Sequence, residues 1–312
     1  MIKKTLCFTN PAYLSLSNGQ MVIKLPEVQA VKDICEVIKK EAIVTRPIED
    51  IGVVILENSR ITITSGLLSA LLQNNCAIIT CNEKQMPIGL QLPLEVNNIQ
   101  HERFMFQINS SLPLKKQLWQ QTVQSKIHNQ RMCLLACKDI AAKTLQRLEE
   151  NVRSGDPDNL EGQAAAFYWK NLFGDRTNFI RDRNGPYPNN LLNYGYAILR
   201  AIVARALVSS GLLPTLGIHH HNRYNAYCLA DDIMEPYRPY VDYLVYQVVL
   251  SSENDLELIP DVKYRLLSIP TIDVNIKGRQ RPLLIGVSET TASLAKCFSG
   301  EIRKISYPEF DE

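Results

Sequence analysis

The sequence has almost no excess of charge of either sign. Its 34 lysine and arginine residues against 32 aspartate and glutamate residues leave a formal net charge of +2. A strongly basic composition would indicate a nucleic-acid-binding protein, so any such binding here requires basic side chains gathered on one face. With 46% hydrophobic and 21% charged residues, the composition excludes a disordered chain and predicts a globular protein.

Several functional motifs are also missing. The chain has no Gly-x-Gly-x-x-Gly loop, no Gly-Lys-Ser/Thr phosphate loop and no Gly-x-Ser-x-Gly turn. Their absence argues against nucleotide hydrolysis and serine hydrolase chemistry. No run of about 20 apolar residues is present, so no membrane association is expected. The basic start lacks a following apolar run, which predicts no signal peptide.

The eight cysteines show no Cys-x-x-Cys spacing. Cys133 and Cys137 lie four apart on an expected helix, but no histidine or second cysteine pair accompanies them. This pattern favours reduced, mostly buried thiols in a cytoplasmic protein over a zinc site or disulfides.

The first part of the chain reads as strands. Alternating runs flank Asn18-Gly19, the dipeptide typical of a two-residue hairpin turn. Short buried strands are expected at 51–56 and 77–81, and Ser65 is expected to cap a helix over 66–72.

After residue 100 the hydrophobic period becomes helical, with long helical runs over 103–152 and apolar helices at 191–207 and 241–250. Residues 174–188 are rich in Gly, Pro, Asp and Asn, which indicates a loop. The predicted class is α+β. We expect a β-rich, sandwich-like domain over 1–95, a linker over 96–100, and a larger all-α catalytic domain over 101–312.

Glu161 is the first candidate for a functional residue. Asp158 or Asn159 can cap a helix that begins there, which places Glu161 in its first turn. The small residues that follow, such as Gly162 and Ala164, leave room for a close neighbour or a ligand. The alternative is that the helix dipole alone favours a glutamate at this end.

Three of the five histidines form one internal run, His219, His220 and His221, after a turn containing Pro214 and Gly217. The run fits either a solvated loop or a loop that delivers one histidine as a metal ligand.

Asp231 and Asp232 precede Glu235 by four and three residues, so each shares a helix face with it. Like charges on one face repel unless a cation or a proton neutralises them. The simplest alternative is that Arg238 pairs with these acids and neutralises them. Clustered carboxylates with one imidazole instead suit Mg²⁺ or Mn²⁺, and they do not suit a structural zinc site.

Four motifs in this order and spacing resemble one family, the CRISPR adaptation integrases (CRISPR-associated protein 1), and in particular their type II branch. The matching pieces are Asn159-x-Glu161-Gly162-x-Ala164-Ala165-x-x-Tyr168, Leu192-Asn193-Tyr194-Gly195-Tyr196, Gly211-Leu212-x-Pro214-x-x-Gly217-x-x-His220 and Asp232-Ile233-Met234-Glu235-Pro236-Tyr237-Arg238-Pro239. The resemblance covers essentially the whole chain. It implies that Glu161, His220 and Glu235 are the catalytic metal ligands, with Asp232, Arg238 and Arg223 around them or on DNA.

The resemblance also implies an activity: a Mg²⁺- or Mn²⁺-dependent endonuclease and integrase that inserts short DNA fragments into the CRISPR repeat by 3′-hydroxyl transesterification. It implies a homodimer bound to a central dimer of CRISPR-associated protein 2. The type II effector nuclease and a DNA-end-binding protein are further expected partners. The alternatives are a non-catalytic DNA-binding scaffold with a degenerate metal site and an unrelated small-molecule metal hydrolase.

Basic residues that are candidates for phosphate contact, each with a solvated surface charge as the alternative, are Arg176, Arg181, Arg183, Arg200, Arg205, Arg223, Arg238, Lys277, Arg279 and Arg281. Some members of the family splay DNA ends with a tyrosine. Tyr13, Tyr168, Tyr194 and Tyr196 are open choices for that role.

Overall fold

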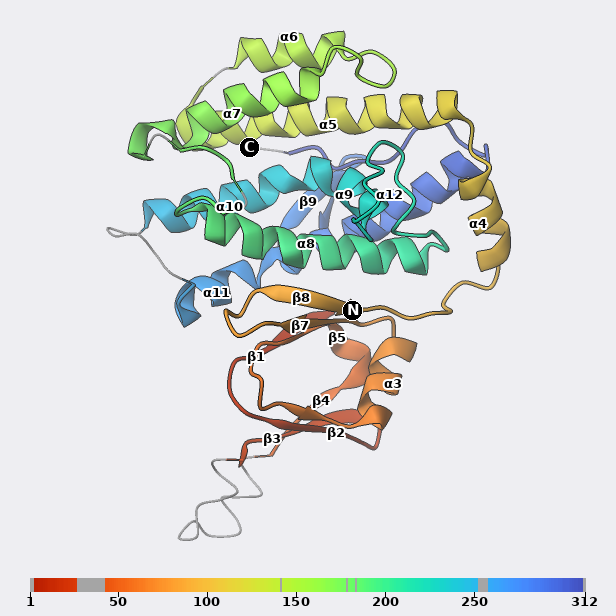
Figure 1. Cartoon of the computed structure of the whole chain (residues 1–312), viewed down its shortest axis with the longest axis vertical. Coiled ribbons are helices and arrows are strands. Elements are labelled where there is room, and N and C mark those ends of the chain that lie inside the picture. The colour runs from red at the N-terminus through yellow and green to blue at the C-terminus, as the bar shows by residue number, and fades with distance from the viewer. Residues whose placement is uncertain are drawn as a thin grey trace. The chain divides into compact units, whose positions relative to one another are not determined.

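The computed structural model describes residues 3–26, 43–140, 142–177, 179–182, 184–251 and 258–310, without the side chains of 175–177. The chain divides into two compact units, Met1–Val96 and Asn97–Glu312 (Figure 1). The first unit is built from strands and the second mainly from helices, which confirms the α+β class.

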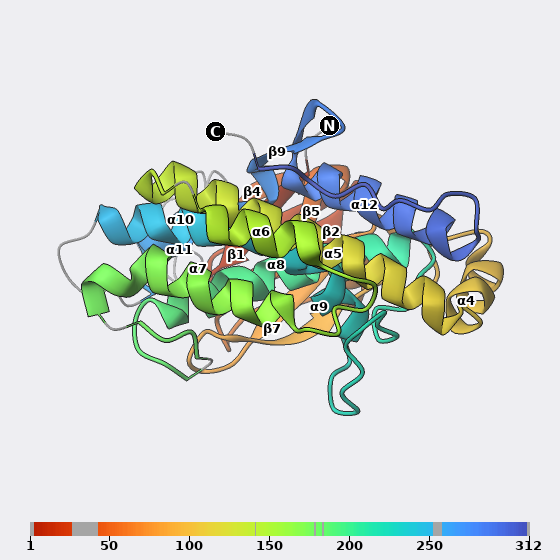
Figure 2. The same ribbon diagram turned by 90° about the horizontal axis from the view of Figure 1, so that it is seen from above.

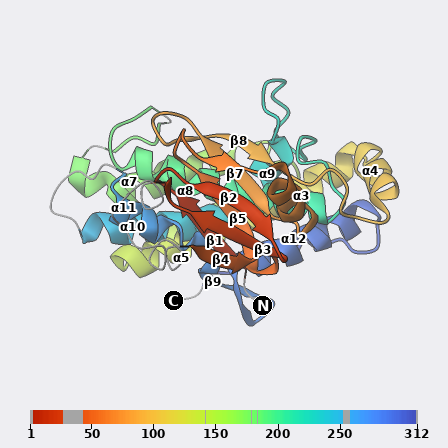
Figure 3. The same cartoon turned by 90° about the horizontal axis from the view of Figure 1, so that it is seen from below.

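The first unit holds two four-stranded sheets (Figure 3). One has the order β1-β5-β7-β8, with parallel pairing from β1 to β7 and an antiparallel edge strand β8. The other has the order β4-β3-β2-β6. Their bounds are β1 Lys4–Phe8, β2 Tyr13–Ser17, β3 Gln20–Lys24, β4 Val44–Pro47, β5 Ile51–Leu56, β6 Thr62–Ile63, β7 Ala77–Cys81 and β8 Pro87–Gln91, with a 3₁₀ turn η1 Ile48–Asp50.

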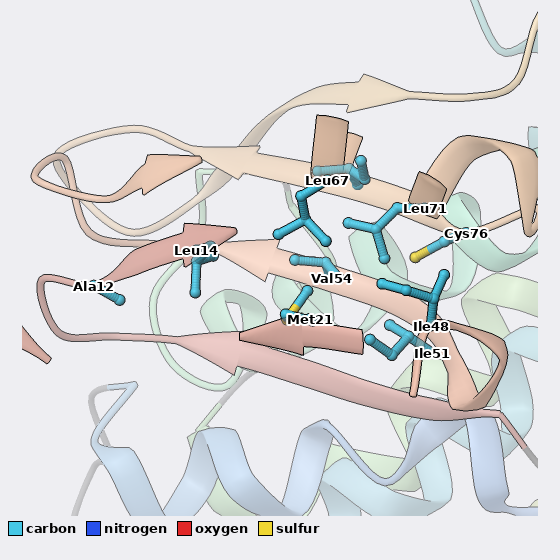
Figure 4. Packing of buried hydrophobic residues seen from close by; sticks show 10 residues of the cluster. Ala12, Leu14, Met21, Ile48, Ile51, Val54, Leu67, Leu71 and Cys76 are labelled. Carbon is cyan, nitrogen blue, oxygen red and sulfur yellow. The ribbon is translucent and has the colours of Figure 1, made fainter. Parts of the chain in front are cut away.

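A single apolar core joins these strands to helix α3 (Ser65–Gln73), as Figure 4 shows. The core side chains are Ala12, Leu14, Met21, Ile48, Ile51, Val54, Leu67, Leu71, Cys76 and Ile78. The strands that supply buried side chains to this core are β2, β3, β5 and β7, and α3 contributes Leu67 and Leu71, four apart on one helix face.

The hairpin prediction is confirmed. Asn18 and Gly19 have φ of 49° and 70° between β2 and β3, the left-handed pair that a type I′ turn requires. The capping prediction for α3 is wrong by one residue. The Thr64 hydroxyl accepts the bond from the Leu67 N–H, and Ser65 is already helical.

The second unit is a helical assembly with one small hairpin. Its elements are α4 Gln100–Ile108, α5 Leu112–Lys138, α6 Lys143–Asn151, α7 Leu160–Thr177, α8 Asn189–Ser209, α9 Cys228–Met234, η2 Glu235–Tyr237, α10 Arg238–Leu250, α11 Pro260–Leu266, η3 Ile269–Thr271, β9 Asp273–Ile276, β10 Arg279–Pro282 and α12 Leu283–Phe298. Helix α5 packs against α6, α7, η2 and α10, while α8 packs against α9, α10 and α12 (Figure 2).

Two helix boundaries and one strand pair differ from the sequence expectation. Helix α7 continues through 174–177 in place of the predicted loop, because Gly174 is tolerated inside a helix. Helix α10 begins at Arg238, since Pro239 fits the first turn of a helix. The antiparallel pair β9–β10 adds two strands to a region predicted to be purely helical.

Helix α8 has the length and apolar composition of a membrane span, but 78% of its apolar window is buried inside the protein. A helix that is apolar on most sides fits a position in a core. Seven cysteines fall within the described residues, all as free thiols, and Cys76, Cys133, Cys228 and Cys297 are buried.

Candidate active site

Helix α7 begins with a double cap that fixes Glu161. The Asp156 carboxylate accepts hydrogen bonds from the N–H groups of Leu160 and Glu161, at 2.9 and 3.0 Å. The Asn159 side chain accepts from the N–H of Gly162 at 3.3 Å. These contacts satisfy helix donors that have no partner within the helix.

Asn159 therefore caps the helix as expected, and the alternative cap, Asp158, is wrong. Asp158 instead pairs with Arg153 at 2.7 Å on the surface. Sequence reasoning missed Asp156, which lies before the cap in a left-handed conformation with φ of 47°.

His220 is delivered by the loop that joins α8 to α9, which we call the histidine loop (residues 210–227). Asp232 on α9 organises it. This fully buried carboxylate accepts backbone bonds from Ile218, His219 and His220 at 2.7, 3.0 and 3.1 Å. It also bonds His220 Nδ1 at 2.6 Å, which leaves Nε2 as the nitrogen available to a ligand. The hydrogen bond to Asp232 raises the pKa of His220, although partial burial opposes it.

Three further features position the histidines. A Cβ at Gly217 would lie 2.2 Å from the His220 carbonyl oxygen and 2.8 Å from the Asp232 carboxylate, so only glycine fits there. His219 stacks on Trp119 of α5, with ring centroids 4.1 Å apart. His221 is exposed and bonds the His219 carbonyl through Nδ1. Of the three, His220 alone bonds Asp232 through its ring.

Glu161 and Glu235, which we call the carboxylate pair, come together around one cation. The Lys126 ammonium of α5 pairs with Glu161 Oε1 and lies 2.6 Å from Glu235 Oε2. The other oxygen of Glu235 lies 3.0 Å from Arg238 Nε. The side chains of Lys126 and Glu235 are only 9% and 7% exposed, whereas that of Glu161 is 28% exposed. The pair therefore opens to solvent on the Glu161 side.

Burial and charge act in opposite directions on these groups. Burial alone would raise the pKa of Glu235, but the positive charges of Arg238 and Lys126 outweigh it and lower the pKa to about 2. Burial alone would lower the pKa of Lys126, but Glu235 and Glu161 leave that pKa raised. The carboxylate of Glu235 and the ammonium of Lys126 are thus both charged at neutral pH.

Arg238 also faces a buried polar network on its other side. Its guanidinium lies 4.5 Å from the centre of the Tyr196 ring. The hydroxyls of Tyr196 and Tyr168 both donate to Asp242, the latter at 3.1 Å. Burial raises the pKa of Asp242 to about 7, and the two tyrosine hydrogen bonds only partly oppose this.

Asp231 and Asn129 make further hydrogen bonds around the site. Asp231 accepts bonds from Arg200 at 2.6 Å and from Asn225 in the histidine loop at 2.7 Å. Asn129 of α5 donates to the Pro236 carbonyl in η2 at 2.7 Å, which anchors the turn that carries Glu235.

The candidate phosphate-binding residues have different surroundings in the structure. Arg223 is exposed in the histidine loop, and its guanidinium lies 4.8 Å from the centre of the Tyr224 ring. The loop between α8 and α9 projects from the helices in Figure 2. Arg200 is engaged with Asp231, and Arg181 donates to Asn189 and Asn193. Arg183 and the side chain of Arg176 lie outside the described residues.

Of the four tyrosines considered for splaying DNA ends, Tyr168, Tyr194 and Tyr196 are buried. Tyr13 is 50% exposed, so it is the one of these four that a DNA end can reach without unfolding a core.

The residues present fit a divalent ion by their chemistry. Two carboxylates and one imidazole are ligands that Mg²⁺ and Mn²⁺ accept. Within the described ranges, no three His, Cys, Asp or Glu side chains converge closely enough to hold a metal as they stand. Lys126 occupies the space between Glu161 and Glu235, and its ammonium marks a place where these carboxylates accommodate a cation.

The fold and site define a two-unit α+β protein in which a carboxylate pair, from the start of α7 and the turn after α9, is accompanied by a histidine from the loop between α8 and α9. The family described as "CRISPR associated protein Cas1" matches residues 6–257. A curated relative, the CRISPR-associated endonuclease Cas1 of Neisseria meningitidis, is 41% identical over 250 residues, covering 80% of this chain and 81% of its own. The chain belongs to the Cas1 family of CRISPR-associated proteins.

Solved structures share the fold. A casposase bound to its integration product superposes with a TM-score of 0.79 at 18% identity, over 99% of this chain and 94% of that one. A Cas6-RT-Cas1–Cas2 complex gives a TM-score of 0.74 at 19% identity, over 99% of this chain and 36% of that one.

Proposed function

We propose that this protein is a divalent-metal-dependent DNA endonuclease and strand-transfer integrase that inserts short DNA fragments into the CRISPR repeat. The observation that carries the proposal is the meeting of Glu161 and Glu235 around one cation. Membership of the Cas1 family and the name of the relative from Neisseria meningitidis, an endonuclease, support it. The likeness to a casposase bound to an integration product supports the strand-transfer step.

Glu161, Glu235 and His220 would hold Mg²⁺ or Mn²⁺. Such an ion, when bound, polarises a phosphoryl group and stabilises the attacking or leaving oxygen. Asp232 orients His220 by accepting from Nδ1, so that Nε2 is the nitrogen that would be left to bind the ion. Arg238 stays against Glu235 and keeps that carboxylate ionised.

In the proposed reaction, the 3′-hydroxyl oxygen of the fragment attacks a repeat phosphodiester. A new P–O bond forms, the existing P–O3′ bond breaks, and the hydroxyl proton ends on the departing oxygen. One phosphodiester replaces another, so no energy source is needed. Water in place of the 3′-hydroxyl gives cleavage, which accounts for an endonuclease activity at the same site.

We also propose the assembly in which this reaction occurs. It comprises a homodimer of this chain, a central dimer of CRISPR-associated protein 2, and DNA. The likeness to a Cas6-RT-Cas1–Cas2 complex, which contains Cas2, supports the second partner. The type II effector nuclease, a DNA-end-binding protein and a cytoplasmic location complete the proposal and rest on the sequence resemblance.

The test is transfer of a labelled short duplex into a repeat-containing plasmid, with Mn²⁺ and the cognate partner protein. The expected result is product from the wild type and none from Glu161→Ala, with DNA binding intact in both. A wild type that binds DNA but gives no product with any divalent ion would point to the non-catalytic scaffold. Cleavage of branched DNA with and without EDTA separates these from a small-molecule hydrolase, which would neither bind nor cleave.

A further inference from the structure

Lys126 is the unexplained member of the site. Its ammonium pairs with both members of the carboxylate pair, although nothing in the proposed reaction requires a lysine there. The side chain reaches this place from the middle of α5 and is 9% exposed. A buried charge of this kind persists only when it is well paired.

The local charges balance without any metal. Glu161 and Glu235 contribute two negative charges, and Lys126 and Arg238 contribute two positive charges. A divalent ion placed between the same carboxylates would lie within a few ångströms of the ammonium. Repulsion at that range in a poorly hydrated site is strong, so ion and ammonium cannot share the place.

We propose that the Lys126 ammonium is an internal counter-ion of the carboxylate pair, and that it must withdraw before a divalent ion binds. The inference rests on the proposed function, because it takes Glu161 and Glu235 as the metal ligands. Lysine suits the role, since its ammonium is a single point charge on a flexible stem. Withdrawal is possible on the Glu161 side, where the side chain is 28% exposed.

Two consequences follow for the free protein. Lys126 lowers its affinity for divalent ions, because each binding event has to break two ion pairs. Lys126 also stabilises the metal-free fold, because without it Glu235 loses one of the two cations beside its carboxylate.

The test is calorimetric titration of Mn²⁺ into metal-stripped protein. We expect Lys126→Met to bind Mn²⁺ at least about tenfold more tightly than the wild type. The control is Lys115→Met, a half-buried lysine three turns earlier on the same helix, which should leave the affinity unchanged. Equal or weaker binding by Lys126→Met would overturn the inference.

Thermal melting gives a second readout. In EDTA, Lys126→Met should melt below the wild type, and saturating Mn²⁺ should raise its melting temperature by more than that of the wild type, because tighter binding stabilises more at equal ion concentration. Equal Mn²⁺-induced shifts in the two proteins would count against the proposal.

A measurement on the wild type covers the case in which Lys126→Met does not fold. Acetylation of Lys126 by acetic anhydride, followed by mass spectrometry, should be slow in EDTA and faster at a saturating Mn²⁺ concentration. Continued protection at saturation would overturn the displacement. If Mn²⁺ binds and Glu161→Gln weakens it, while Lys126 stays protected, only this inference fails. If no protein binds Mn²⁺, the proposed metal site fails with it.

Discussion

The indole of Trp119 and the imidazole of His219 stack with their centroids 4.1 Å apart and their planes 3° from parallel. The same indole meets His220 edge-on at 5.7 Å. The indole of Trp119 thus contacts the rings of two successive histidines. Trp119 is only 3% exposed, so it belongs to the core as well as to the site.

Replacing Trp119 should disturb the histidine loop. Trp119→Ala removes the indole that both histidine rings contact, and we expect the free energy of unfolding to fall by about 3–5 kcal/mol. Strand transfer should fall further than stability accounts for, because His220 loses its lateral support. Trp119→Phe keeps an aromatic face and should retain most activity. Urea unfolding and strand transfer, measured on both variants, check this; equal activities of the two would refute it.

Asp232 should matter through the backbone that it holds. Asp232→Asn replaces one acceptor oxygen by an N–H₂ group that faces N–H donors, so we expect a loss of about 1–3 kcal/mol. The matched control is Asp158→Asn on the surface, where the pair with Arg153 is largely exposed and stability should hardly change. Denaturant midpoints of the two variants give the comparison. A wild-type midpoint in Asp232→Asn would contradict the role of Asp232.

Gly217 should tolerate no side chain. In Gly217→Ala the new Cβ meets the His220 carbonyl, which belongs to backbone and cannot swing away. We expect a loss of about 2 kcal/mol from overpacking, together with loss of activity. Gly66→Ala is the control, since a Cβ there meets nothing within 4 Å and alanine favours the helix. Melting temperatures should move in opposite directions, and a shared direction would contradict the prediction.

Asp242 should make stability depend on pH. Its pKa is about 7 in the folded protein and near the ordinary value of 3.8 in the unfolded chain. Between these values the unfolded chain releases the proton while the folded protein keeps it. The Asp242 contribution to stability is therefore greatest at low pH, falls as pH rises from about 4 to 7, and is constant above.

Asp242→Asn lacks this titration. The free energy of unfolding of the wild type minus that of Asp242→Asn should therefore decrease between pH 4 and pH 7 and then level off. Urea titrations of both proteins across this range measure the difference, in which the other ionisable groups largely cancel. A difference that rises with pH, or stays flat, would falsify the shift.

Local signals make the first unit predictable. The Asn18-Gly19 turn and the buried strand β5 are each determined within a few residues, and the sequence predicts both. The family motifs also single out Glu161 and Glu235, which the structure brings to one point. The role of Lys126 is not predicted from the sequence, because nothing in the neighbouring sequence indicates a functional residue there. Its role appears only when α5 packs against α7 and η2, which is a tertiary event.

Three residues that support the site lie on one helix, the 27-residue α5. Trp119 contacts the histidine loop, Lys126 contacts the carboxylate pair, and Asn129 contacts the turn after Glu235. Residues seven apart on a helix share a face, so Trp119 and Lys126 point the same way. The spacing between the histidine loop and the carboxylate pair therefore depends on side chains of one helix. A partner that shifts or tilts α5 would therefore move Trp119, Lys126 and Asn129 together.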